Sequence, residues 1–347
     1  MNRRYGGTKR RAFWIAVLIT GLSSSVLAAS GGNLEIIDQT GAVVLVELPV
    51  ERVVSVYGMG TYYLYALGAE DLLVGGGYVG VKSVPQASEA LVRLEPRLEE
   101  LFVFGDPSPE EILLRDPDLI LTDASRHAAF AEQMSDLGVP TLQYVVETSD
   151  EMREALRLTA LAFGPEAQRR SEAFDAELER IFHTIETDLE SLSIDERVRV
   201  LFLGTSTELV ASGDMYQTEL IERAGGRSVS GGLVGYWNEV NLEQVLAWNP
   251  DVIIIPPYGP VQPGDLLENP DWASVGAVQS GRVHRMPRII APMDTPVPES
   301  LVGVVWLAHQ FYPDRISLDI VGEAASFYET FYDLELTEAE RGLLGTP

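Results

Sequence analysis

The sequence contains no cysteine. Disulfide bonds, iron–sulfur ligation, thiol catalysis and lipid attachment to an N-terminal cysteine are therefore excluded. Histidine is also scarce, since the chain has only four, namely His127, His183, His284 and His309. No two of them stand at metal-ligand spacing, and direct capture of bare zinc or manganese would need clustered histidines and carboxylates. We therefore predict no protein metal site and no cofactor.

Basic residues are few. Lys and Arg number 25 against 52 Asp and Glu, which gives a formal net charge of −27. Beyond residue 28 the only lysine is Lys82. This excess of negative charge argues against binding to nucleic acid or docking on anionic lipid, because both partners are themselves negative. An acid-rich surface suits a high-salt environment, but ordinary solubility also explains it.

Long apolar runs are missing as well. The strongest run, residues 12–22, is far short of the ~20 residues that span a bilayer. It follows a basic start, and Val26 and Ala28 suit cleavage after Ala28, so residues 1–28 are predicted to be a signal peptide. An uncleaved anchor is the weaker alternative. Arg10 and Arg11 faintly resemble a twin-arginine signal, so the export route stays open.

One amphipathic stretch dominates the middle of the chain. Pro165 follows Gly164, which suits the first turn of a helix. Apolar residues then recur by threes and fours from Phe174 to Leu192, and no further glycine or proline interrupts them. The pattern predicts a single helix over residues 165–192, which at ~1.5 Å per residue would be about 40 Å long.

Two similar sequence units flank this helix. Residues 109–121 and 242–254 each begin with a glutamate-led amphipathic turn, continue through Pro-Asp, and end in an apolar run typical of a buried parallel strand. Strand and helix patterns alternate on both sides, which indicates the α/β class. We therefore predict two similar Rossmann-like α/β lobes joined by one long helix. The predicted divisions are a signal peptide (1–28), a first lobe (29–164), the connecting helix (165–192) and a second lobe (193–347) with a terminal helix near residues 323–332.

Residues 75–80 match the glycine pattern of dinucleotide-binding folds. That pattern requires a helix to open at its last glycine and an acidic residue at a strand end about 20 residues later. Residues 81–85 do not resemble a helix start, and Glu99 lies in a charged, helix-like segment. We therefore predict a flexible loop beside a cleft rather than a nucleotide site.

The candidate ligand site follows from the α/β pattern. Ligands of open α/β sheets bind at loops after the carboxyl ends of strands, here residues 57–61, 123–127, 204–207, 256–258 and 287–294. Aromatic residues in and near these loops offer rigid contact surfaces to a flat or catecholate ligand, and Arg126 or Arg288 could pair with an anionic chelate. Ordinary loop packing is the competing interpretation. The candidates are Tyr57, Met59, Tyr78, Arg126, Tyr216, Tyr236, Trp237, Tyr258 and Arg288.

Several features together resemble the periplasmic substrate-binding proteins of ABC importers for iron–siderophore, haem and cobalamin uptake. They are the strand and glycine start at residues 53–58, the two glutamate-led units, the connecting helix, Gly281-Arg282-Val283 followed by Trp306-Leu307-Ala308, and the tail from Phe327. The resemblance spans nearly the whole chain from residue 34. Its specificity comes from the order of these features together with the repeat.

This resemblance implies a function as well as a fold. A ligand would sit between the lobes of a monomer in the periplasm, and the loaded protein would dock on the permease dimer of an ABC importer with its ATPase subunits. The implied ligand is an iron complex, with a ferric siderophore favoured and haem or cobalamin as alternatives. Asp294 stands where the family contacts its ligand.

The resemblance also implies two docking residues. Glu110 and Glu243 each stand seven residues before the repeated proline, at the family's permease-docking positions. Two equivalent carboxylates could engage two symmetric arginine sites at once and gain from effective concentration. The simpler interpretation is that each glutamate only favours its helix dipole.

An exported hydrolase is the remaining alternative. The sequence has no Gly-x-Ser-x-Gly elbow, and no histidine stands in a recognisable order with a serine and an aspartate. His127 could be an axial haem ligand, but an ordinary surface histidine is the favoured interpretation. We therefore predict a binding protein and not an enzyme.

Overall fold

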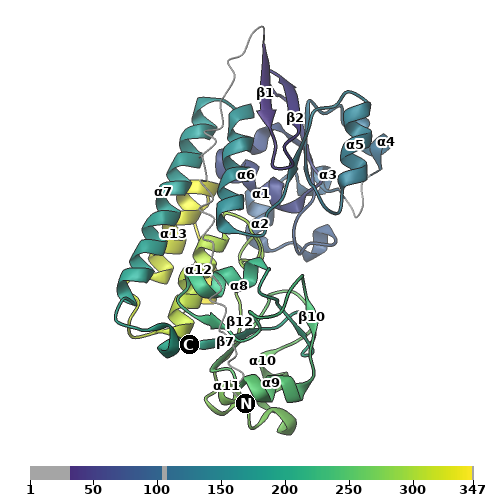
Figure 1. Cartoon of the computed structure of the whole chain (residues 1–347). Coiled ribbons are helices and arrows are strands. Elements are labelled where there is room, and N and C mark those ends of the chain that lie inside the picture. The colour runs from purple at the N-terminus through teal and green to yellow at the C-terminus, as the bar shows by residue number, and fades with distance from the viewer. Residues whose placement is uncertain (1–31, 104–107, 346–347) are drawn as a thin grey trace, which may run out of the picture.

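The first lobe is built on a parallel sheet. The computed structural model describes residues 32–103 and 108–345. Strands β3 (Val53–Ser55), β4 (Leu73–Gly76), β5 (Leu119–Asp123) and β6 (Thr141–Tyr144) lie in the order β4-β3-β5-β6, and every pairing is parallel. A separate antiparallel hairpin of β1 (Asn33–Ile37) and β2 (Val43–Glu47) stands at the top of this lobe (Figure 1).

The second lobe repeats this sheet with the same strand order. Strands β7 (Arg199–Phe202), β9 (Arg227–Ser228), β11 (Val252–Ile255) and β12 (Val283–Arg285) lie in the order β12-β11-β7-β9, again all parallel. When strands are numbered along the chain within each lobe, both sheets have the order 2-1-3-4. The predicted α/β class with two similar lobes is therefore confirmed. A short antiparallel pair, β8 (Leu209–Val210) and β10 (Asn238–Glu239), accompanies the second sheet.

Helices cover both faces of the first sheet. Leu119 and Leu121 of β5 point into a large core cluster that includes α1 (Gly58–Leu67) and α6 (Ser149–Ala162). Ile120 points the other way, toward α4 (Pro109–Leu113) and α5 (Ala128–Asp136). This alternation is the period of two expected of a strand, and burial on both faces explains the unbroken apolar sequence.

The second sheet has the same two-sided cover. Phe202 and Ile254 point into the large cluster with α8 (Tyr216–Arg223) and α12 (Ser300–Phe311). Leu201 and Ile253 face the opposite side, where three short helices pack. These are α9 (Leu242–Trp248), α10 (Pro263–Leu267) and α11 (Gly276–Gln279).

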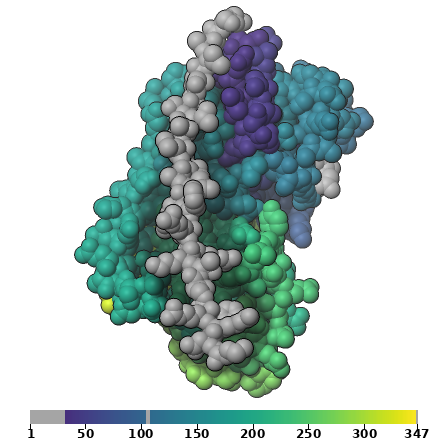
Figure 2. Space-filling view, viewed as in Figure 1, coloured from purple at the N-terminus to yellow at the C-terminus, as the bar shows by residue number. Residues whose placement is uncertain are grey.

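Helix α7 (Pro165–Asp188) joins the lobes and packs against both. Its apolar stripe of Phe174, Leu178, Ile181 and Ile185 is buried. It lies along α1 and α6 of the first lobe and along α8 and α12 of the second. Figures 1 and 2 show it as the left flank of both lobes. One hydrophobic cluster therefore runs from one lobe into the other.

The connecting helix is shorter than predicted. It ends at Asp188 rather than at residue 192, with Leu189 as its C-cap. Leu189 stays buried against Gly225 of the second lobe, and Leu192 packs on the same core. The apolar spacing therefore continues through the turn that follows the helix. For this reason the spacing alone cannot show where the helix ends.

The C-terminal helices return to the first lobe. Helix α13 (Ile320–Tyr332) packs on α12 and also on α1. A further helix, α14 (Glu338–Leu344), carries Glu340, which forms a salt bridge of 2.8 Å with Arg93. Arg93 belongs to α2 (Glu89–Leu94), which is followed by α3 (Leu98–Leu101). These contacts cross the predicted boundary at residue 193.

The predicted signal peptide, residues 1–28, lies outside the described residues. Within the ranges that the structure describes, no helix combines the length and apolar character needed to cross a membrane.

Arg170 of α7 ties three helices together. Its guanidinium donates to the Ala66 carbonyl at 3.0 Å, to the Phe331 carbonyl at 2.9 Å and to the Thr330 carbonyl at 3.2 Å. These carbonyls lie in the last turns of α1 and α13, where intrahelical donors run out. We predict that Arg170→Met lowers the free energy of unfolding by about 1–3 kcal/mol, because these carbonyls lose a charged donor.

Urea denaturation of the purified protein measures this change. The matched control is Arg169→Met, because the neighbouring Arg169 is exposed and pairs with Glu166 on the helix surface. Its effect should stay below about 0.5 kcal/mol. An equal loss in both variants would contradict the role assigned to Arg170.

Candidate ligand-binding site

A cavity of about 1000 Å³ lies between the two lobes. The segments that follow β3, β4, β5 and β6 form its wall on the first lobe. The wall on the second lobe consists of the start of α8 and of residues 236–237, 258 and 295–296. Most of these segments follow the carboxyl ends of parallel strands, where ligands of open α/β sheets bind. The volume is at the upper end of the range for small-molecule pockets.

Eight of the ten predicted ligand contacts line this cavity. They are Tyr57, Met59, Tyr78, Arg126, Tyr216, Tyr236, Trp237 and Tyr258. The fold therefore brings together residues that are up to about 200 positions apart in the sequence. Their contact with a ligand stays a prediction.

The other two candidates stand behind the wall. Arg288 donates to the backbone carbonyls of Gly80 at 3.0 Å and Ile290 at 3.1 Å, and so joins the second lobe to the glycine loop of the first. Asp294 is fully buried and accepts a hydrogen bond of 2.6 Å from the hydroxyl of Tyr258. Each is therefore bonded to a residue that lines the cavity, Gly80 for Arg288 and Tyr258 for Asp294.

Glu299 holds the loop that carries Asp294. Its fully buried carboxylate accepts the N–H groups of Ile290 at 3.1 Å and Ala291 at 2.7 Å, and the hydroxyl of Tyr328 on α13. Residues 289–300 are all buried, which is unusual for a loop because its backbone groups then need internal partners. Burial raises the pKa of Glu299 to about 7, and the three hydrogen bonds oppose that rise.

Two of the cavity tyrosines use their hydroxyl groups inside the protein. Tyr78 pairs with the Tyr65 hydroxyl at 3.0 Å, and Tyr216 pairs with the hydroxyl of Ser300 at 2.7 Å. Burial raises the pKa of both phenols above their ordinary value. These residues therefore offer ring surface to the cavity rather than a free hydroxyl group.

An acid–histidine pair at the cavity was missed by the sequence analysis. Asp123, the last residue of β5, accepts hydrogen bonds from the His127 ring and from the N–H groups of Ser125 at 3.0 Å and Arg126 at 2.6 Å. Burial alone would raise the pKa of Asp123, but these hydrogen bonds hold it below its ordinary value. The Asp-x-x-x-His spacing at a strand end was the available signal. In the described residues, no cluster of three His, Asp or Glu side chains could hold a metal ion.

Contacts across the cavity connect the two lobes at its rim. Tyr236 of the second lobe and Glu147 of the first both line the cavity, and Tyr236 opposes the rise that burial causes in the pKa of Glu147. The N–H group of Ser149 donates to Glu219 of α8 at 2.7 Å. The cavity is therefore bounded by both lobes and not by one alone.

The cavity wall contains features that favour anionic groups. Lys82 lines it and is the only lysine in the part of the chain that the structure describes. Helices α1 and α8 both begin at the wall, and neither N-terminus has a side-chain cap. First-turn N–H groups of such helices attract anions.

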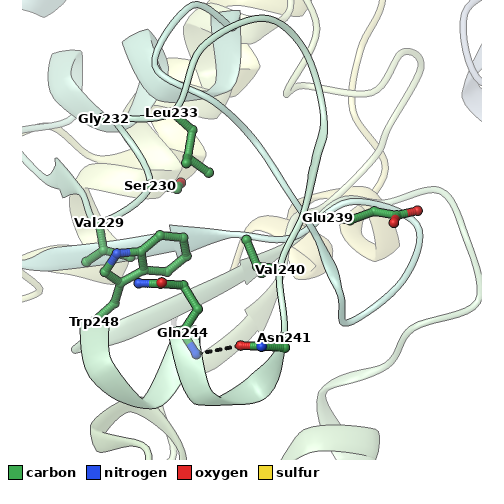
Figure 3. A pocket seen from close by; sticks show the side chains of 9 residues that line it. All are labelled: Val229, Ser230, Gly232, Leu233, Glu239, Val240, Asn241, Gln244 and Trp248. Carbon is green, nitrogen blue, oxygen red and sulfur yellow. Dashed lines mark hydrogen bonds between the residues drawn. The ribbon is translucent and has the colours of Figure 1, made fainter.

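A second pocket, of about 490 Å³, lies on the second lobe alone. Figure 3 shows the Trp248 ring beside the Gln244 side chain on α9, facing the loop that includes Ser230 and Leu233. Asn241 caps this helix by accepting the N–H of Gln244 at 2.9 Å. Among the residues that the structure describes, none of the first lobe borders this pocket, and none of the predicted ligand contacts lies in it.

Glu110 and Glu243 occupy equivalent places in the two lobes. Each lies exposed in the first turn of a capped helix, α4 or α9, that covers the outer face of its sheet. One turn later, Leu113 and Leu246 are 39% and 37% exposed. Each place therefore combines a carboxylate with an accessible apolar side chain.

Known proteins resemble this chain over most of its length. The sequence profile of one family, described as periplasmic binding protein, matches residues 53–289. The molybdate-binding protein MolA of Haemophilus influenzae is 26% identical over 93% of this chain and 97% of its own length. The solved structure of MolA bound to molybdate has a TM-score of 0.75 at 23% identity, covering 87% of this chain and 99% of that chain.

Two further relatives bind larger ligands according to their names. The vitamin B12-binding protein of Pectobacterium carotovorum subsp. carotovorum is 28% identical over 59% of this chain and 71% of its own length. The Fe(3+)-citrate-binding protein YfmC of Bacillus subtilis is 26% identical over 52% of this chain and 56% of its own length.

The raised pKa of Glu299 makes stability depend on pH. The folded protein keeps this proton up to about pH 7, whereas the unfolded chain releases it near the ordinary value of 4.5. The folded state therefore binds more protons between these values, and stability falls as pH rises through this window. We predict that Glu299→Gln removes this loss, so that its free energy of unfolding rises relative to wild type by about 1–3 kcal/mol from pH 5 to pH 8.

Urea denaturation of both proteins across this pH range measures the difference. Asp294 titrates in both proteins, so its contribution cancels. A difference that does not change with pH would contradict the prediction.

Proposed function

The chain belongs to the periplasmic binding protein family, and from that premise we propose that it captures a ferric siderophore in the cavity between its lobes and delivers it to an ABC importer. The family match covers most of the chain. The protein is accordingly a substrate-binding protein and not an enzyme.

The observation that carries the siderophore proposal is the size and lining of the inter-lobe cavity. About 1000 Å³ bounded by Tyr57, Trp237 and Tyr258 suits a bulky chelate with planar chelating groups, because aromatic rings supply large rigid contact areas. Lys82 and the uncapped helix N-termini suit the anionic oxygens of such a chelate. The name of YfmC, an iron-complex binder, supports this class.

A tetrahedral oxyanion is the second candidate ligand. The match to MolA, named for molybdate, extends over nearly the full length of both chains. Uncapped helix N-termini also suit an oxyanion. Cobalamin is a further alternative because of the vitamin B12-binding relatives. Haem is another, because the aromatic residues that line the cavity suit a flat ligand.

Titration of the purified protein from residue 29 distinguishes these ligands. We predict that ferric siderophores such as ferrichrome and ferric enterobactin quench the fluorescence of Trp237 saturably, with a Kd below about 1 µM. Sodium molybdate, haem and cyanocobalamin serve as the competing ligands. Trp237→Phe is the control, since it should lose most of the quenching while calorimetry still detects binding.

If molybdate binds saturably and no iron chelate binds, the proposed ligand is an oxyanion and not a siderophore. Binding of none of these compounds, with turnover of an ester or phosphate substrate, would overturn the proposed function.

We further propose that Glu110 and Glu243 dock the loaded protein on the permease dimer. This proposal is supported by the equivalent positions of the two residues. Both are exposed in helices that cover the outer faces of two sheets with the same strand order. A permease dimer with two equivalent basic sites could bind both at once, and the second contact gains from the effective concentration set by the first.

We predict that the double variant Glu110→Arg, Glu243→Arg lowers uptake through the importer at least about tenfold, while the Kd for ligand in solution stays within about twofold of wild type. Uptake of radiolabelled iron–siderophore into proteoliposomes measures the first quantity, and calorimetry the second. The matched control is Glu172→Arg, Glu186→Arg, which makes the same charge change at exposed positions of α7. Equal losses in both double variants would assign the effect to net charge instead of docking.

A further inference from the structure

Asp294 is a buried carboxylate directly behind the cavity wall. Its Oδ2 atom receives the Tyr258 hydroxyl at 2.6 Å and the Gln217 amide nitrogen at 3.4 Å. The same amide nitrogen donates to the backbone carbonyl of Asp294 at 2.9 Å. Tyr258 and Gln217 line the cavity. The Oδ1 atom of Asp294 has no hydrogen-bond partner among the residues that the structure describes.

The chemistry of these groups sets the direction of each hydrogen bond. A carboxylate and a carbonyl oxygen can only accept. Tyr258 therefore gives its single O–H proton to Asp294, and Gln217 turns its NH₂ group toward Asp294. The side-chain polar atoms that these bonds leave over on the two lining residues are the hydroxyl lone pairs of Tyr258 and the carbonyl oxygen of Gln217. Both are hydrogen-bond acceptors.

We propose that Asp294 makes this wall of the cavity a hydrogen-bond acceptor surface, so that the ligand presents N–H or O–H donors to Tyr258 and Gln217. Asp294 is then a positioning residue that acts through these two side chains rather than a ligand contact. The inference rests on the proposed function and narrows the class of its ligand.

The acceptor surface separates the two candidate ligand classes. Molybdate at neutral pH carries acceptor oxygens and no donor, so its oxygens would lose hydrogen bonds to water here without replacement. A siderophore with amide or peptide N–H groups satisfies the same atoms. Lys82 and the first turn of α1 form a wall on the other lobe that suits anionic oxygens. A ligand that fits these groups therefore carries anionic oxygens toward Lys82 and the first turn of α1, and hydrogen-bond donors toward Tyr258 and Gln217.

Protonation of Asp294 reverses the direction of its bond to Tyr258. A neutral carboxyl group can donate to the Tyr258 oxygen, which frees the Tyr258 proton for the cavity. Burial raises the pKa of Asp294 to about 6, and the hydrogen bonds from Tyr258 and Gln217 oppose the rise. The reversal therefore falls between about pH 7 and pH 5.

Other titratable groups surround this site, and their pH effects must be distinguished from that of Asp294. The loop after β11 contributes Tyr258, α8 contributes the neutral Gln217, and the loop that carries Asp294 ends in the buried Glu299. The first-lobe wall contributes the ionisable side chains of Lys82, Asp123, Arg126, His127 and Glu147. Only a pH effect that disappears in an Asp294 variant is assigned to Asp294.

Two substitutions of Asp294 test the proposal by calorimetry at pH 7.5. Asp294→Leu removes the acceptor and leaves the Tyr258 proton free to face the cavity, whereas Asp294→Asn keeps an oxygen for Tyr258 and cannot titrate. The probes are ferrichrome, whose peptide ring carries N–H donors, and sodium molybdate. We expect Asp294→Leu to lose about tenfold or more in ferrichrome affinity and to gain about threefold or more in molybdate affinity. Asp294→Asn should stay within about threefold of wild type for both.

The opposite signs distinguish this role from structural damage, which would weaken both probes. A change of the same sign for both probes overturns the proposal. Tyr144→Phe is the matched control, because Tyr144 lines the cavity while its hydroxyl group pairs with Thr159. Should Asp294→Leu fail to fold, Tyr258→Phe takes its place, with loss of ferrichrome and unchanged molybdate binding as the expected result.

A measurement without ligand separates failure of this inference from failure of the proposed function. In protein labelled with [¹³Cζ]tyrosine, the Tyr258 resonance, assigned by its loss in Tyr258→Phe, should shift between about pH 7 and pH 5 in wild type and stay constant in Asp294→Asn. If the shift is seen but neither probe binds, the proposed siderophore ligand is wrong. The link between the protonation of Asp294 and the hydrogen bond of Tyr258 is then still supported. A resonance that stays constant in wild type overturns the inference whichever ligand binds.

Discussion

The two lobes share one hydrophobic core, and the cavity depends on this continuity. Phe174 and Ile181 of α7 belong to the same cluster as Leu121 of the first sheet and Ile254 of the second. Close packing leaves little room for one sheet to slide against the other, because interiors have the density of organic crystals. The carboxyl ends of both sheets are therefore held around one space, and α13, which packs on α12 and on α1, adds contacts between the lobes.

The segment between β12 and α12 contributes both to the stability of the fold and to the wall of the candidate site. It is buried over most of its length, and two carboxylates on it have different tasks. Glu299 supplies acceptors to the backbone of the segment and to Tyr328, which stabilises its course. Asp294 faces the cavity wall and sets the hydrogen bonds of Tyr258 and Gln217. Both carboxylates resist ionisation because burial disfavours their charge.

The two proposed contacts differ in the charges that they carry. The chain carries a formal net charge of −27, and its cavity wall contains Lys82 and Arg126 beside Asp123 and Glu147. The outer helices instead expose Glu110 and Glu243, each beside an accessible leucine. The proposed docking surface would therefore attract a partner with basic sites, whereas the cavity wall offers charges of both signs to a ligand.

The sequence by itself determined the α/β class, the two similar lobes, the connecting helix and the strand-end loops of the candidate site. These features depend on apolar periodicity and on the positions of glycine, proline and helix caps, which are local properties of the chain. Only the tertiary structure decided where α7 ends, that α13 and α14 return to the first lobe, and that Asp123 pairs with His127. It also decided that Arg288 bonds to Gly80, 208 positions away, and that Asp294 orients Tyr258, 36 positions away. The direction of a side-chain hydrogen bond is set by whichever distant group packing brings within 3 Å or so, and no local pattern in the sequence records that partner.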